Sequence, residues 1–127
     1  MRALLLAPLA VLSIVAPALA TETKPFSQTA FDAAQAAGQP ILIYVHAWWC
    51  PICAKQGPTL EKLQQSAELG DLIVFKVDFD SQKDLVRHFG AQMQSTLIVF
   101  HGKVEKGRSA GVTDPQKIHD LLLLAKS

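Results

Sequence analysis

The most constraining feature of this chain is an apolar run at residues 41–45 that leads, a few residues later, into Cys50-Pro51-Ile52-Cys53. A continuous apolar run of this length is typical of a central strand that is buried on both faces of a sheet. The chain has two cysteines, and both lie just after this strand, which we expect at residues 41–47. The pattern therefore predicts a strand followed by a helix that begins at Cys50.

A Cys-x-x-Cys pair at such a junction is suited to reversible dithiol–disulfide chemistry. The N-terminus of a helix presents unpaired N–H groups and a partial positive charge, which stabilise a thiolate relative to a thiol. The thiolate is the attacking species in disulfide exchange, and a second cysteine one turn further along can resolve the mixed disulfide. We therefore interpret Cys50 as the nucleophile and Cys53 as the resolving thiol.

Two other uses of the cysteine pair stay open. A structural disulfide across so short a loop would constrain little of the unfolded chain. A zinc site needs about four ligands. Cys50 and Cys53 supply two, and the remaining candidates are scattered histidines at positions 46, 88, 101 and 119. We predict no metal site within one chain, although two chains sharing a metal would satisfy the ligand count.

The N-terminal segment has the pattern of a cleavable secretory signal peptide. Arg2 precedes an apolar stretch that closes with Ala18-Leu19-Ala20 before the polar residues 21–24. This small-residue ending, with Pro8 and Pro17, favours cleavage after Ala20 over an uncleaved membrane anchor. The mature domain would then span residues 21–127, with eleven basic and eleven acidic residues and no charge excess that points to nucleic acid or an anionic membrane. We expect a periplasmic or secreted protein without stable membrane contact after cleavage.

The remaining sequence predicts one α/β domain in which helices and strands alternate. Gly and Pro residues and helix caps mark the boundaries, such as Ser27, Gly38 and Pro40, and Asp114 followed by Pro115. The predicted helices are residues 24–39, 50–69, 80–89 and one beginning at Pro115; the predicted strands are 41–47, 72–79, 96–101 and 104–106. Strands joined through helices pair in parallel, and the closing hairpin adds an antiparallel edge.

Three segments together resemble the thioredoxin family. They are Trp49-Cys50-Pro51-Ile52-Cys53 with Pro58 beyond it, Phe75-Lys76-Val77-Asp78, and the strand and turn from Thr96 to Lys103. The resemblance extends over about residues 24–125 and implies a thioredoxin fold, with a central mixed sheet of about four strands flanked by helices. It also implies a thiol–disulfide oxidoreductase, most similar to exported bacterial members, that needs no organic cofactor.

The chain departs from the family pattern at Ser95. Family members place a cis-proline just before the threonine matched by Thr96, and this proline lies against the active-site sulfurs. A cis bond before a non-proline residue costs about 2.5–4 kcal/mol, so we expect a trans bond before Ser95. The resemblance implies that Ser95 and Thr96 shape the site, and loss of the proline makes a metal or iron–sulfur site on the same cysteines the main alternative.

A second departure concerns proton transfer. The position of the family's buried aspartate is Tyr44, a poor base at neutral pH because its reference pKa is about 10. Lys76 matches the lysine that partners this aspartate, so proton transfer to and from Cys53 would use water, Lys76 or another group. His46 stands at a usually aromatic position; as a cation it would lower the pKa of Cys50, and as a neutral core residue it would do little.

The resemblance also suggests the remaining site residues and the partners. Trp49, Pro51 and Ile52 flank or separate the cysteines and are expected to shape the site. The expected partners are protein dithiols or disulfides and an electron donor or acceptor, and we expect a monomer. Because the chain lacks the inserted helical domain of exported oxidases, reductant is slightly favoured over oxidant. A redox-inert binding protein with this fold remains a further alternative.

Overall fold

The computed structural model describes residues 10–13 and 23–127. The predicted signal peptide lies outside the described residues except for residues 10–13, which are exposed and belong to no helix or strand. No helix in the described part of the chain combines the length and apolarity needed to cross a membrane. The elements in chain order are β1 (Thr23–Pro25), α1 (Gln28–Ala36), β2 (Pro40–His46), α2 (Pro51–Gln64), β3 (Ile73–Asp78), α3 (Lys83–His88), β4 (Thr96–His101), β5 (Val104–Ala110), α4 (Pro115–Leu123) and a 3-10 turn at Leu124–Lys126.

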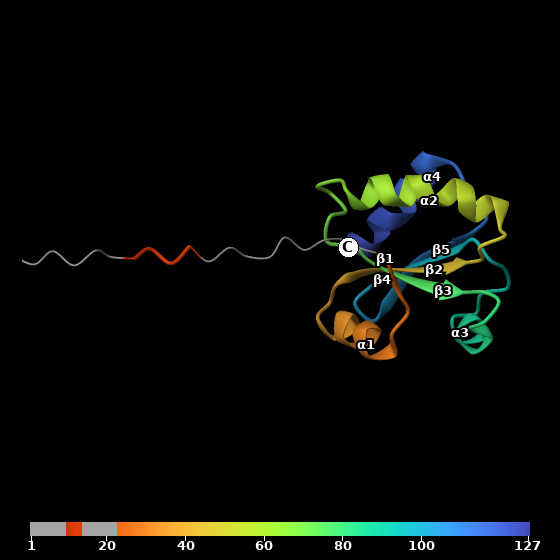
Figure 1. Cartoon of the computed structure of the whole chain (residues 1–127), viewed down its shortest axis with the longest axis horizontal. Helices are drawn as coiled ribbons and strands as arrows, with labels where there is room; N and C mark the ends of the chain where they lie inside the picture. Colours follow the sequence, from red (N-terminus) through yellow and green to blue (C-terminus); the bar gives the residue numbers. More distant parts are fainter. Residues whose placement is uncertain (1–9, 14–22) are drawn as a thin grey trace, which may run out of the picture.

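The strands form one mixed sheet in the order β1-β3-β2-β4-β5. β3 pairs in parallel with both β1 and β2, whereas β4 is antiparallel to β2 and to β5. In Figure 1, α2 and α4 lie on one side of the sheet, and α1 and α3 lie on the other. This architecture confirms the predicted thioredoxin fold, with β2 at the centre of the sheet.

The first predicted helix was wrong at its beginning. Thr23–Pro25 form an edge strand because their backbone pairs with β3, and this pairing continues where Phe26 N–H donates to Lys76 O at 2.9 Å. The sheet therefore has five strands rather than about four. The helix starts only at Gln28, where the predicted cap Ser27 accepts a hydrogen bond from Ala30 N–H at 3.3 Å.

Other predicted boundaries were off by a few residues. α2 ends at Gln64 rather than at residue 69, because residues 65–71 form turns before β3. α3 is shorter than predicted, and β5 extends to Ala110 instead of stopping at residue 106. β5 is polar and largely exposed, so its pairing with β4, rather than its own apolar pattern, determines its length. The cap of α4 was predicted correctly, since Asp114 Oδ1 accepts from Lys117 N–H at 3.0 Å.

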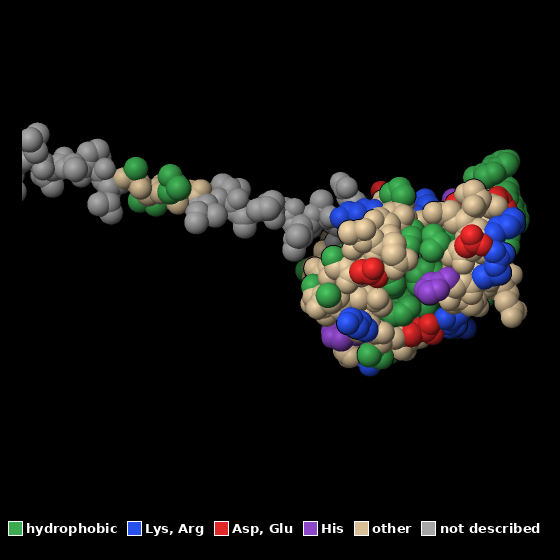
Figure 2. Space-filling model, turned by 90° about the horizontal axis from the view of Figure 1, so that it is seen from below, with side chains coloured by type: hydrophobic (Ala, Val, Ile, Leu, Met, Phe, Trp, Pro, Cys, Tyr) green, Lys and Arg blue, Asp and Glu red, His purple; other side chains and the backbone are tan. Residues whose placement is uncertain are grey.

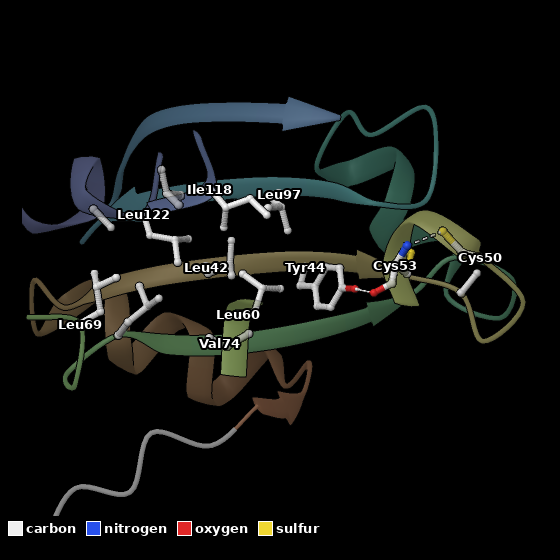
Figure 3. Packing of buried hydrophobic residues seen from close by; sticks show 14 residues of the cluster. Leu42, Tyr44, Cys50, Cys53, Leu60, Leu69, Val74, Leu97, Ile118 and Leu122 are labelled. Carbon is white, nitrogen blue, oxygen red and sulfur yellow. Dashed lines mark hydrogen bonds between the residues drawn. The ribbon is translucent and has the colours of Figure 1, made fainter. Parts of the chain in front are cut away.

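Alternation along β2 divides the core between the two faces of the sheet. Ile41, Ile43 and Val45 face α1 and α3, whereas Leu42 and Tyr44 face α2 and α4. The three aliphatic residues on the first face are fully buried, which contributes about 1.5–3 kcal/mol each. Figure 3 shows the second face, where leucines surround Tyr44 and the packing continues to Cys53 and Cys50.

Charged groups on the outer surface are mixed in sign. Figure 2 views the molecule from the side of α1 and α3, and basic and acidic side chains are interspersed there among polar and apolar ones. This distribution agrees with the near balance of twelve basic and eleven acidic residues in the whole chain. The viewed face therefore offers no extended field of one sign for steering a charged macromolecule.

Candidate active site

The two cysteines occupy the junction between the central strand and α2. Cys50 is the N-cap residue of α2, and its Sγ accepts a hydrogen bond from Cys53 N–H at 3.0 Å. Pro51 follows at the first helical position, where its missing N–H leaves no donor unsatisfied. Both sulfurs are free thiols, and both residues are buried. The geometry places Cys50 Sγ where a helix N-terminus stabilises negative charge.

The environment of Cys53 favours its protonated form. Burial is the largest cause that raises the pKa of the Cys53 thiol, and the hydrogen bond with the Cys50 sulfur raises it further. A protonated Cys53 avoids two adjacent negative sulfurs in a site from which water is largely excluded. The pair is therefore asymmetric: Cys50 Sγ receives a helix N–H, whereas Cys53 holds its proton.

Tyr44 contacts Cys53 from the central strand. Its hydroxyl donates to Cys53 O at 3.2 Å, as Figure 3 shows. Burial raises the pKa of Tyr44 above its ordinary value, and the neighbouring Cys53 adds to the shift. Tyr44 is therefore a neutral hydrogen-bond donor at physiological pH and does not supply a base.

Lys76 and His46 are both neighbours of Tyr44 in the sheet, Lys76 on β3 and His46 two residues further along β2. Lys76 pairs with Tyr44 across β2 and β3, and both line an open hollow of about 620 Å³ beside α2. His46 packs edge-to-face on Tyr44 with ring centroids 5.4 Å apart. Burial and the nearby Lys76 lower the pKa of His46, so this imidazole is neutral at pH 7. Of the two roles predicted for His46, the neutral imidazole corresponds to that of a core residue with little influence on the cysteines.

The loop before β4 carries Ser95 in an unusual backbone conformation. No described peptide bond is cis, so the expected trans bond before Ser95 is confirmed. Ser95 is fully buried with a φ of 64°, which is in the left-handed region and costs a non-glycine residue about 1–2 kcal/mol. Its N–H donates to Val45 O at 2.7 Å and its carbonyl accepts from Gly111 N–H at 3.1 Å. Thr96 is also buried, and its hydroxyl donates to Met93 O at 2.7 Å.

Sequence reasoning missed Gln56, which connects this loop to α2. Gln56 is fully buried, and its Nε2 donates to Ser95 O at 3.1 Å and to Val112 O at 2.9 Å. No donor among the described residues reaches its Oε1. The spacing of Cys53, Gln56 and Leu60 places all three on one buried helical face, and a polar residue in that pattern was the signal that could have identified it.

The tryptophans beside the cysteines differ in their exposure. Trp49 is 46% exposed, and its indole N–H donates to Asp80 Oδ2 at 2.8 Å, which anchors the ring to the loop after β3. Trp48 is 85% exposed. Asp80 was not predicted as part of the site, because its partner is 31 residues away in sequence.

The fold thus gathers most of the residues that the sequence singled out. Cys50, Pro51, Ile52 and Cys53 form the first turn of α2 and its cap, and a side-chain atom added at Gly111 would lie 3.9 Å from Ile52 Cδ1 and 4.0 Å from Ser95 Oγ. The loops before β4 and after β5 therefore adjoin the cysteine turn. Within the described residues, no group of three or more His, Cys, Asp or Glu side chains is placed to hold a metal ion.

A free dithiol that caps a helix after a buried central strand defines, with this sheet order, a class of thiol–disulfide exchange proteins. The chain belongs to the thioredoxin family, since residues 22–123 match the family model described as Thioredoxin. It is 32% identical over 99 residues to Thioredoxin 1 of Chlorobaculum tepidum, a match that covers 78% of this chain and 97% of that relative.

Two further comparisons extend this assignment. The chain is 39% identical over 77 residues to protein disulfide-isomerase tigA of Aspergillus niger, which covers 59% of this chain and 21% of that longer protein. The crystal structure of Trxlp from Edwardsiella tarda is similar with a TM-score of 0.77 and 42% identity, over 80% of this chain and 98% of that one. The protein is therefore a thioredoxin-family thiol–disulfide oxidoreductase.

Proposed function

We propose that this protein exchanges electrons with protein disulfides in an exported compartment through Cys50 and Cys53, and that it acts there as a reductant. The observation that carries the proposal is the asymmetry of the pair, in which Cys50 Sγ accepts the Cys53 N–H at the start of α2 and Cys53 has a raised pKa. An attacking thiolate and a waiting thiol are the two states that such an exchange requires.

In the reducing direction, the Cys50 thiolate attacks one sulfur of the partner's disulfide. A mixed disulfide forms, and the partner's other sulfur leaves as a thiolate that takes up a proton. Cys53 then loses its proton and attacks Cys50 Sγ, which releases the second partner thiol and leaves a Cys50–Cys53 disulfide. Two electrons pass to the partner, and an electron donor must later reduce the pair again.

Proton transfer in this scheme needs no carboxylate beside Cys53. Tyr44 stays protonated and orients Cys53 through its carbonyl group, while the hollow lined by Tyr44 and Lys76 gives water access beside α2. Water or Lys76 accepts the Cys53 proton as the second step proceeds.

The compartment and the direction of electron flow belong to the proposal. The signal-peptide pattern of residues 1–20 supports export to the periplasm or to the medium. The described domain has one sheet and no inserted helical domain, which supports the reductant direction. We propose that the mature protein, residues 21–127, acts as a monomer without stable membrane contact.

The equilibrium reduction potential of the Cys50–Cys53 couple tests this proposal. It is measured by tryptophan fluorescence in glutathione and dithiothreitol buffers, with the metal content of the same sample determined. We expect a value near that of thioredoxin, about −270 mV. A value near −120 mV would make the protein a disulfide donor, and a pair that binds metal and does not titrate would contradict the exchange role of the cysteines.

A further inference from the structure

Gln56 joins three segments that meet behind the cysteine turn. It lies on α2 one turn after Cys53 and is fully buried. One amide group donates to Ser95 O at 3.1 Å and to Val112 O at 2.9 Å, so a single side chain connects the helix of the cysteines to the loops before β4 and after β5.

The orientation of this amide is determined by its surroundings. Two carbonyl oxygens can be satisfied only by the NH₂ group, because the amide oxygen has no hydrogen to donate. Both hydrogens of Nε2 are therefore used, and Oε1 is left without a donor among the described residues. A buried acceptor without a partner is destabilising. An apolar residue at this position would have no polar atom of its own to satisfy, but it would take a donor away from Ser95 O and Val112 O. The glutamine is thus better suited to holding the two loops than to filling the core.

The loop that Gln56 holds needs such support. Ser95 has a φ of 64°, a conformation that persists for a serine only where neighbouring groups maintain it. Its N–H, carbonyl and hydroxyl all have partners: Val45 O, the N–H groups of Gly111 and Gln56 Nε2, and Gln94 O, respectively. Gln56 supplies the only side chain from α2 in this set.

We propose that Gln56 is a positioning residue for the recognition of protein substrates, because it maintains the Ser95 and Val112 loops as a fixed surface beside Cys50. Gly111 adjoins both Ile52 Cδ1 and Met93 Cε at 3.9 Å from where its side chain would begin, so these loops border the cysteine turn. A folded partner that presents a disulfide to Cys50 contacts them, whereas a small disulfide reaches the sulfur without them. The inference rests on the proposed exchange role of the cysteines.

The test variant is Gln56→Met, in which an apolar side chain of similar length replaces the amide group and both of its N–H donors. Pre-reduced protein is mixed with insulin as the protein disulfide, or with oxidised glutathione as the small one, and thiol oxidation is followed by tryptophan fluorescence. We expect the half-saturating insulin concentration to rise about tenfold, the value for two lost hydrogen bonds, with the maximal rate within about twofold of wild type. The rate with oxidised glutathione and the reduction potential should not change.

Gln64→Met is the matched control. Gln64 is a buried glutamine two turns further along α2, and its Nε2 donates to Thr23 Oγ1 at 3.1 Å, away from the cysteines. This variant should leave the half-saturating insulin concentration within about twofold of wild type. Equal effects of the two variants, or an unchanged insulin dependence in folded Gln56→Met, would overturn the inference. Failure of wild-type protein with both disulfides would instead contradict the proposed function.

Two further measurements keep the inference testable if Gln56→Met does not fold. In Gln56→Glu, the protonated acid still donates one hydrogen bond, whereas the carboxylate repels both carbonyl oxygens. The half-saturating insulin concentration should therefore rise with pH more steeply than in wild type. The wild-type pH profile serves as the reference for the part of the pH dependence that comes from titration of the thiols. In wild-type protein, both side-chain amide protons of Gln56 should exchange slowly with solvent, and rapid exchange of either would contradict the proposed role.

Discussion

The two faces of the central sheet are both lined by buried residues but contain different kinds of groups. Towards α1 and α3, phenylalanine rings contact one another at centroid distances of 5.5–6.3 Å, and the cluster is entirely apolar. Towards α2 and α4, leucines surround buried polar or reactive groups, namely Tyr44, Cys50, Cys53 and Gln56. The face towards α1 and α3 therefore contributes stability through apolar packing alone, whereas the face towards α2 and α4 combines packing with the cysteine site.

This division follows from the alternation of side chains along a strand. Neighbouring residues of β2 point to opposite faces, so Ile43 and Tyr44 belong to different clusters although they are adjacent in sequence. A polar group on the site face needs a defined partner, as Tyr44 has in Cys53 O. The comparison predicts that changes on the site face alter chemistry, whereas changes on the aromatic face alter stability.

The largest expected effect is on the site face, at Cys50. In Cys50→Ser, disulfide exchange should fall by at least about 1000-fold, because a hydroxyl is a far weaker nucleophile than a thiolate. The free energy of unfolding of the reduced protein should change by less than about 1 kcal/mol. Insulin reduction and urea unfolding provide the two measurements.

Cys53→Ser is the control for the order of the two cysteines. This variant should still attack the partner's disulfide through Cys50 and accumulate a mixed disulfide, which non-reducing electrophoresis detects. Accumulation in Cys50→Ser instead would reverse the proposed roles of the two thiols.

The aromatic face should respond with the opposite pattern. Phe31 is buried and its ring contacts Phe26, Phe75, Phe89 and Phe100. Phe31→Ala should lower the free energy of unfolding by about 3–5 kcal/mol, since the cavity cannot collapse completely. The reduction potential of the folded variant should stay that of wild type; a shift of about 30 mV, equivalent to about 1.4 kcal/mol, would show that the two faces are coupled.

The smallest effect is a pH dependence of stability from Cys53. Its pKa is raised in the folded state, so above the unfolded thiol pKa of about 8.5 the unfolded chain releases this proton before the native protein does. The unfolded state then binds fewer protons, and the free energy of unfolding of the reduced protein should fall as pH rises from about 8.5 through the folded pKa of Cys53. Urea unfolding between pH 7 and 10 measures this fall.

Cys53→Ala should make this fall shallower, because the variant lacks the titrating thiol. An equally steep fall in the variant would assign the pH dependence to other groups.

Much of the fold was predictable because its signals are local. The apolar run of β2, the caps Ser27 and Asp114, and Pro115 at the start of α4 each act within a few residues, and the structure contains all of them. β1 and the full length of β5 were not predictable in this way. Both are exposed and lack an apolar pattern, and they are strands because β3 and β4 offer them backbone partners.

The site divides along the same line. The sequence alone predicted the strand, the helix that starts at the cysteine pair, and the trans bond before Ser95. Each of these features depends on local backbone preferences or on the spacing of two residues. Only the tertiary structure decided that Gln56 reaches loops 39 and 56 residues away, that Trp49 binds Asp80, and that His46 is neutral. These features depend on which distant segments meet and on how much water they exclude, and neither property is encoded in any short stretch of the chain.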